Sequence, residues 1–292
     1  HGFINAGINR FSLGVQSFNN QILQQSGRRH CREDAEKACL WLKRVYDSGL
    51  ISSWSLDLIQ NLPLSGFIEW QDDLKKAVTF SPPHISIYDL NIENGTVFKK
   101  LVNLGKLKLP SDEEAFRNSE STHLILKNSG YSRYEISNYC LPRHQSRHNR
   151  VYWSGLGWWS FGQGSTSSPW GEKFTRPRVS KEYKDWVISQ NELSLDSSLI
   201  NNHFVYKELD EKIMLGLRLK EGIDIIKLLK EQNWENKKFE RNLSKLIKEW
   251  ERFLQSGLLV KKGNRFFLSE PKGMELSNQI LISMFKWWDD IN

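Results

Sequence analysis

The first half of the chain alternates between two patterns of apolar residues. Short apolar runs bounded by turn residues, the pattern of buried strands, occur at residues 8–16, 52–60 and 84–90. Each run precedes a stretch with apolar residues at helical spacing, and these stretches are residues 33–48, 70–78 and 116–126. Three successive strand–helix units predict an α/β fold with parallel strands and right-handed crossovers. Residues 131–140 add a fourth extended segment.

The second half of the chain changes character twice. Residues 141–180 are rich in Trp, Gly and Pro, which predicts a long, ordered loop that contributes to a site. The following elements are predicted as helices over 206–219 and 239–256, a hairpin turning at 262–264, and a last helix at 274–288. They resemble a small, mainly helical winged-helix-like domain. We therefore predict two domains, residues 1–180 and 181–292.

Composition narrows the class of protein. The chain is 39% apolar and 26% charged, and no apolar run approaches the roughly 18 residues of a membrane span, which leaves only peripheral membrane contact open. The net charge of +7 is spread along the chain without a basic arm, so nucleic acid is not expected as a partner. Three scattered Cys without a C-x-x-C pair predict a reduced, cytoplasmic protein. A first residue of His1 instead of Met suggests a fragment.

Candidate chemistry lies at the carboxyl ends of the predicted strands, where parallel α/β folds bind ligands. Asp57 stands in an apolar strand, where a carboxylate is costly unless it binds a ligand or forms an ion pair, and both interpretations stay open. Gln16 ends the first strand and either contacts a ligand or caps a loop, and Asp89 lies near the end of the third. Arg28 follows Gly27 and is either an anion contact or a solvated charge.

A dense cluster of His, Arg and aromatic residues fills positions 143–153. An anionic macrocycle would use a histidine, His144 or His148, as an iron ligand, the arginines for carboxylates and the aromatic rings for stacking. Nucleic acid would use the same side chains, and a third interpretation is a loop whose His and Arg cap backbone carbonyls. The sequence has no dinucleotide-binding or phosphate-loop motif and no Ser/His/Asp or H-E-x-x-H signal.

Several segments occur in the order found in one known family. They are GINRFSLGVQSFN (7–19), GRRH (27–30), LDLIQNLP (56–63), HISIYDLNIENGTVF (84–98), YEISNYCLP (134–142) and SRHNRVYW (146–153). The chain resembles the oxygen-independent coproporphyrinogen III oxidase family, and within it the HemW-type heme chaperone branch. The resemblance covers residues 3–180 and continues more weakly through IMLGLRLKEGID (213–224).

The resemblance implies a radical S-adenosylmethionine (radical SAM) fold, of which this chain would be the C-terminal half of a partial (β/α)6 barrel. Family members carry a [4Fe-4S] cluster on a C-x-x-x-C-x-x-C loop, which is not in this sequence. We expect the cluster cysteines upstream of His1 and assign no metal ligand within the chain. The chain by itself is then expected to bind neither the cluster nor S-adenosylmethionine with normal affinity.

The resemblance also implies roles for single residues. Gln16, Arg28 and Asp57 match positions that contact S-adenosylmethionine in the family. The heme-binding motif H-N-x-x-Y-W matches residues His148, Asn149, Tyr152 and Trp153. Two departures concern the loop after the second strand, because family members usually have Gly at position 61 and G-Q-T at positions 64–66. No catalytic residue is assigned.

Three functions follow from these observations. The first is a heme chaperone that transfers heme to respiratory acceptor proteins. The second is the coproporphyrinogen III oxidase reaction of porphyrin biosynthesis, an oxidative decarboxylation that gives protoporphyrinogen IX. The third treats residues 200–292 as a DNA-binding winged helix, although the broad apolar faces of its helices favour packing on a barrel.

Overall fold

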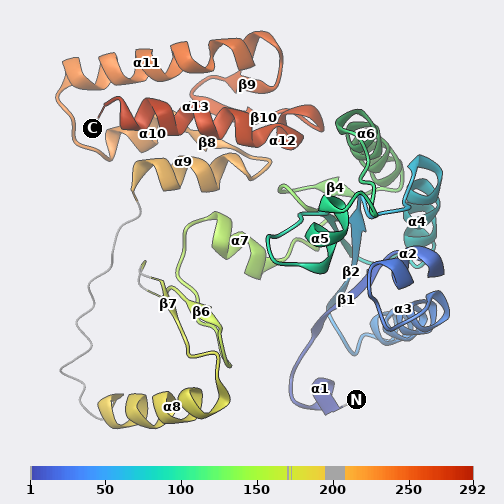
Figure 1. The fold of residues 1–292 in the computed structure, drawn as a ribbon. Helices are drawn as coiled ribbons and strands as arrows, with labels where there is room; N and C mark the ends of the chain where they lie inside the picture. Colours follow the sequence, from blue (N-terminus) through green and yellow to red (C-terminus); the bar gives the residue numbers. More distant parts are fainter. Residues whose placement is uncertain (1, 170, 172, 195–207, 292) are drawn as a thin grey trace. The chain divides into compact units, whose positions relative to one another are not determined.

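A computed structural model describes residues 2–169, 171, 173–194 and 208–291 (Figure 1). The chain forms two compact units: unit 1 comprises residues 1–145 and 269–276, and unit 2 comprises residues 146–268 and 277–292. These units are defined by compactness. The predicted domain boundary at residue 180 does not coincide with them and stays a prediction.

Unit 1 is built on a five-stranded sheet in the order β1-β2-β3-β5-β4 (Figure 1). Its strands are β1 (Arg10–Gln16), β2 (Ser53–Gln60), β3 (His84–Asp89), β4 (Ser132–Arg133) and β5 (Asn138–Cys140). The first three strands are parallel, as the sequence pattern predicted. The fourth extended segment divides into β4 and β5, and β5 runs antiparallel to both β3 and β4.

Helices cover one face of this sheet. Those of unit 1 are α1 (Gly2–Asn5), α2 (Asn20–Gln25), α3 (Arg32–Asp47), α4 (Phe67–Thr79), α5 (Val97–Asn103), α6 (Asp112–Asn128) and α12 (Lys272–Glu275). The three predicted helices correspond to α3, α4 and α6. Helices α3 and α4 each contribute an apolar stripe to the core, whereas α6 contributes Leu126 and otherwise buries mainly polar residues. Ser111 and Glu114 form a capping box that fixes the start of α6. The strands complete the core with Trp54, Leu56 and Ile85, which are fully buried.

The loop after β2 adopts a backbone that its sequence does not favour. Asn61 and Leu64 have φ angles of 63° and 66°, in the left-handed region where glycine is preferred. Asn61 tolerates this conformation and uses its side chain: its Nδ2 donates to Asp89 Oδ1 at 2.6 Å, and its Oδ1 accepts from Asn118 at 2.9 Å. The departure from glycine at position 61 therefore keeps the left-handed turn and adds two hydrogen bonds.

Unit 2 combines helices with short strands. Its elements are α7 (Arg147–Trp153), β6 (Thr166–Ser167), β7 (Phe174–Thr175), α8 (Ser180–Ser194), α9 (Leu209–Leu217), β8 (Ile223–Asp224), α10 (Ile225–Lys230), α11 (Asn236–Gln255), β9 (Leu259–Lys262), β10 (Arg265–Leu268) and α13 (Ser277–Asp289). The predicted hairpin is confirmed as β9 and β10, and β8 adds a strand that the pattern did not indicate. The segment 141–180 is not only a loop, because it holds α7 and the β6–β7 pair.

Two further predictions concern the helices. The start of the helix expected over 206–219 falls partly on residues 206–207, which lie outside the described residues. Among the helices that the structure describes, none is both long and apolar enough to cross a membrane.

Candidate functional site

The face of the sheet that α3, α4 and α6 leave uncovered is polar. Alternate strand residues point to this face, and those with polar side chains include Ser12, Gln16, Ser55, Asp57, His84 and Ser86. Ser12 and Gly14 are exposed, and Asp57 is half-buried. In the register of the parallel strands, Asp57 lies opposite both Gly14 and Ser86. A carboxylate in the middle of the sheet therefore has access to solvent.

Two serines hold the Asp57 carboxylate. Ser12 donates to Oδ2 at 2.7 Å, and Ser55 donates to Oδ1 at 2.9 Å. Within the described residues no cation forms an ion pair with Asp57. The structural ion pair considered from the sequence is therefore not found there. Asp57 is instead a carboxylate with one strong donor on each oxygen.

The Ser55 hydroxyl extends this arrangement into the interior. It lies 2.8 Å from His84 Nδ1, and His84 Nε2 lies 2.9 Å from the Tyr134 hydroxyl. Because Ser55 gives its only hydrogen to Asp57, it accepts from Nδ1–H, which leaves Nε2 to accept from Tyr134. The result is a directed series of hydrogen bonds from Tyr134 through His84 and Ser55 to Asp57. We call these four residues the relay.

Burial controls the protonation of the relay. His84 is 1% exposed, and burial together with the positive charges of Arg10 and His144 lowers its pKa from 6.5 to about 3. A neutral imidazole has one donor and one acceptor nitrogen, as the relay requires. Burial and the charge of Asp57 also raise the pKa of Tyr88, which lies on the same face. Near neutral pH, His84 is therefore a fixed, uncharged link.

Gln16 lies beside Asp57 on the open face. Its φ of 70° accompanies a β-bulge between Gly14 and Gln16 that ends the pairing of β1 with β2. Its side chain folds back over Gly14, because a Cβ at that position would lie 2.7 Å from Gln16 Nε2. The side-chain amide makes no hydrogen bond within the described part of the chain, so the interpretation as a loop cap has no support.

Arg28 is placed differently. It lies on the exposed turn between α2 and α3, directly after Gly27, whose φ is 71°. No hydrogen bond or ion pair links Arg28 to Gln16 or Asp57 among the described residues. The structure thus brings together two of the three residues matched to cofactor positions. Asp89 is held by Asn61 and has a pKa raised by burial, which indicates a structural role.

The H-N-x-x-Y-W motif forms the short helix α7. His148 is exposed, and its Nε2 lies 3.0 Å from the Tyr152 hydroxyl, with the two rings edge to face at 4.9 Å. The Tyr152 ring also meets Trp158 edge to face at 4.6 Å. The guanidinium of Arg218 lies 5.3 Å from the centre of the Trp153 ring. The helix therefore presents His148 to solvent, while the rings of Tyr152 and Trp153 contact Trp158 and Arg218.

The backbone N–H of Asn149 takes part in the cap at the start of α7. It donates to Ser146 Oγ at 3.3 Å, which caps α7. Arg150, in the same helix, forms an ion pair with Glu221 at 2.8 Å. These contacts set the start and the orientation of α7 within unit 2, so the motif residues project from a supported helix.

The cysteines do not form a metal site. Cys39 and Cys140 are buried, and burial raises the pKa values of their thiols to about 12 and about 11. Cys31 caps α3 together with Asp34. Across the described residues, no group of three His, Cys, Asp or Glu side chains could hold a metal ion. A [4Fe-4S] cluster therefore does not fit these residues, whereas the open carboxylate and amide of Asp57 and Gln16 fit a ligand with hydroxyl or ammonium groups.

Sequence reasoning missed most of the relay. Ser55, His84 and Tyr134 of the relay, and Ser12, which also holds Asp57, received no role from the sequence, because each is an ordinary residue in its own segment. The available signal was the alternation of polar residues along three adjacent strands, which places Ser12, Ser55 and His84 on one face once the strands are parallel.

Comparison with known proteins first defines the class. The chain shares the fold of the structure described as "Coproporphyrinogen III oxidase (HemN) from Escherichia coli is a Radical SAM enzyme", with a TM-score of 0.68 at 17% identity. The match covers 97% of this chain and 65% of that structure, slightly less than two thirds of its length. No family model matches the chain. The TM-score shows that the described fold is that of this HemN structure.

Sequence relatives identify the family. The chain is 36% identical to the heme chaperone HemW of Synechocystis and 29% identical to the heme chaperone HemW of Lactococcus lactis, over 97% and 98% of its length. In each case it spans 70% of the relative. A mitochondrial radical S-adenosyl methionine domain-containing protein 1 of Danio rerio is 28% identical over 96% of the chain and 61% of that relative. The chain belongs to the heme chaperone HemW family.

Proposed function

We propose that this chain is part of a heme chaperone, which binds heme and transfers it to respiratory acceptor proteins. Family membership supports the proposal, and the observation that carries it is the exposed His148 on α7. A neutral imidazole is a common axial ligand of heme iron. The likeness to the coproporphyrinogen oxidase, at 17% identity, extends to the fold, so the oxidase reaction is not proposed for this chain.

The geometry of α7 gives each motif residue a task. Tyr152 holds the His148 ring through its hydroxyl at 3.0 Å, which limits rotation of the imidazole before iron binds. Tyr152 and Trp153 supply aromatic rings, and the backbone N–H of Asn149 donates to the capping residue Ser146. Iron bound at Nε2 would replace the Tyr152 hydrogen bond, because the nitrogen has one lone pair.

We propose that the open face of the sheet is the binding site for S-adenosylmethionine. Asp57 and Gln16 would contact polar groups of this cofactor, and Arg28 would reach it from the turn before α3. The relay keeps Asp57 oriented toward the open face.

The proposal includes the finer architecture. The sheet of unit 1 would be the C-terminal half of a partial (β/α)6 barrel within residues 1–180. The helices and strands of residues 181–292 would form a winged-helix-like domain. We propose a cytoplasmic location, with peripheral membrane contact where respiratory acceptors are met.

Heme titration tests the function. The 292-residue chain is titrated with hemin, and binding is followed through the Soret absorbance of wild type, His148→Ala and the control His30→Ala. We expect His148→Ala to weaken binding by about tenfold or more, since an iron ligand is lost, and His30→Ala to leave it unchanged. Equal affinity of wild type and His148→Ala would overturn the assignment of His148.

A further inference from the structure

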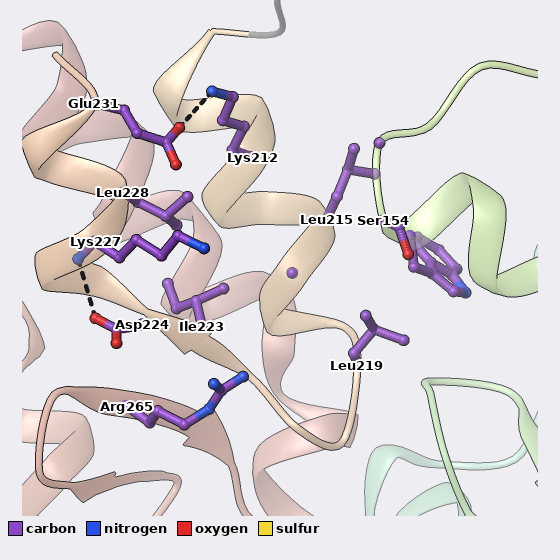
Figure 2. Close-up of a pocket in the computed structure, with 13 residues that line it drawn as sticks. Ser154, Lys212, Leu215, Leu219, Ile223, Asp224, Lys227, Leu228, Glu231 and Arg265 are labelled. Atoms are coloured by element: carbon purple, nitrogen blue, oxygen red, sulfur yellow. Dashed lines mark hydrogen bonds and ion pairs between the residues drawn. The ribbon is translucent and has the colours of Figure 1, made fainter.

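Unit 2 contains a pocket whose lining lies mostly outside the H-N-x-x-Y-W motif. It has a volume of about 470 Å³ and is lined by the end of α7, by α9 and α10, and by the strands β8 and β10 (Figure 2). This volume lies in the range of pockets that bind small molecules and cofactors, roughly 300–1,000 Å³. Trp153 of the motif lines the pocket, whereas His148 is not among its lining residues.

One side of the pocket is apolar. Leu215, Leu219 and Ile223 supply aliphatic walls (Figure 2), and Trp153 adds its indole. Gly216 lets α9 approach β8 closely, because a Cβ there would lie 2.4 Å from Ile223 Cγ2. The cation–π contact of Arg218 with the Trp153 ring holds this wall in place. The surface suits a flat, apolar ligand.

The other side of the pocket carries three cations, Lys212, Lys227 and Arg265, and the last two keep donors for a ligand. Lys212 is neutralised by Glu231 at 2.7 Å, and the Asp224 carboxylate caps α10 by accepting from the backbone N–H of Lys227. Among the described residues, no carboxylate forms an ion pair with the side chain of Lys227 or Arg265. Figure 2 shows these two charged ends on either side of Ile223.

Backbone contacts fix the position of the Arg265 side chain. Arg265 donates through Nε to the Glu221 carbonyl at 3.1 Å and through Nη2 to the Gly222 carbonyl at 3.3 Å. Its guanidinium is therefore held in place while keeping donors for a ligand. Lys227 is exposed and reaches the pocket from α10. The pocket thus offers one anchored and one adaptable cation next to an apolar wall.

We infer that this pocket binds the porphyrin of heme by its ring edge and its propionates. The inference rests on the proposed function, which supplies the identity of the ligand. The macrocycle would insert between Leu219 and Trp153, and the two carboxylates would reach Lys227 and Arg265. Because His148 does not line the pocket, this recognition acts on the ring and the carboxylates and does not require iron.

Three probes separate these contributions. The 292-residue chain is titrated with hemin, with metal-free protoporphyrin IX, which keeps the carboxylates, and with hemin dimethyl ester, which lacks free carboxylates. The test variant is Lys227→Glu, and the matched control is Lys245→Glu, an exposed lysine of α11 that does not line the pocket. Circular dichroism checks that both variants keep the helical content of wild type.

We expect Lys227→Glu to weaken both hemin and protoporphyrin IX by about tenfold or more, because a charge-assisted contact becomes a repulsion. Lys245→Glu should change either affinity by less than about twofold, since exposed charges at a distance are screened. The dimethyl ester should bind wild type weakly and be insensitive to Lys227→Glu. His148→Ala should weaken hemin and leave protoporphyrin IX unchanged.

The two proposals fail in different ways. Hemin binding that depends on His148 but responds equally to Lys227→Glu and Lys245→Glu would overturn the pocket and leave the proposed function standing. Protoporphyrin IX binding that depends on Lys227, with no binding of hemin, would overturn the proposed function and support the pocket. Protoporphyrin IX affinity unchanged by Lys227→Glu would overturn the pocket outright.

Discussion

The buried imidazole of His84 should make the stability of the protein depend on pH in a defined window. In the unfolded chain a histidine titrates near its ordinary pKa of 6.5, whereas burial lowers the pKa of His84 to about 3 in the folded protein. Between these values the unfolded chain binds a proton that the folded protein does not. This contribution to stability is therefore complete above pH 6.5 and is lost progressively as the pH falls toward 3.

The size of the effect follows from the same two pKa values. Each pH unit within the window is worth about 1.4 kcal/mol, so His84 alone should reduce the free energy of unfolding by about 2 kcal/mol between pH 7 and pH 5. Asp73 acts in the opposite direction, because burial raises its pKa to about 6. Its contribution is common to wild type and a His84 variant and cancels in their difference.

The assay is urea unfolding followed by Trp fluorescence at pH 7 and pH 5. We expect the free energy of unfolding to fall by about 2 kcal/mol more in wild type than in His84→Asn. Tyr134→Phe serves as the control: it removes the hydrogen bond to Nε2 and costs about 1 kcal/mol at both pH values, but it leaves His84 buried. Equal pH dependence of wild type and His84→Asn would refute the reasoning.

Three further substitutions test the packing of the units. Glu275→Ala leaves the buried Arg133 guanidinium without the carboxylate 2.8 Å away and should cost about 3 kcal/mol in urea unfolding; a loss within error contradicts this. Asp73→Asn removes a carboxyl that stays protonated to higher pH in the folded protein than in the unfolded chain. The free energy of unfolding should therefore fall by about 2 kcal/mol more in wild type than in the variant between pH 4 and pH 7; the same fall in both would contradict this. Gly222→Ala places a Cβ at a φ of 61° only 2.0 Å from the Phe266 carbonyl, so its melting temperature should fall sharply.

The long elements of the fold were predictable from the sequence, and the short ones were not. The parallel strands β1, β2 and β3 and the helices α3, α4 and α6 have enough residues for a period to appear. The helix α7 has seven residues and β8 has two, which is too short for a pattern. The antiparallel direction of β5 depends on contacts with β3 from far along the chain, which local sequence does not encode.

The site shows the same division between local and tertiary information. Asp57 was identified because a carboxylate among Leu56 and Leu58 is anomalous within its own strand. The partners that orient it come from other elements, and their hydrogen bonds depend on strand register and on the tautomer of His84, which only the fold defines. Since Ser12 and Ser55 hold both carboxylate oxygens in place without a ligand, Asp57 is oriented before binding. Binding of a polar ligand at this face would then cost less conformational entropy, because the Asp57 side chain is already ordered.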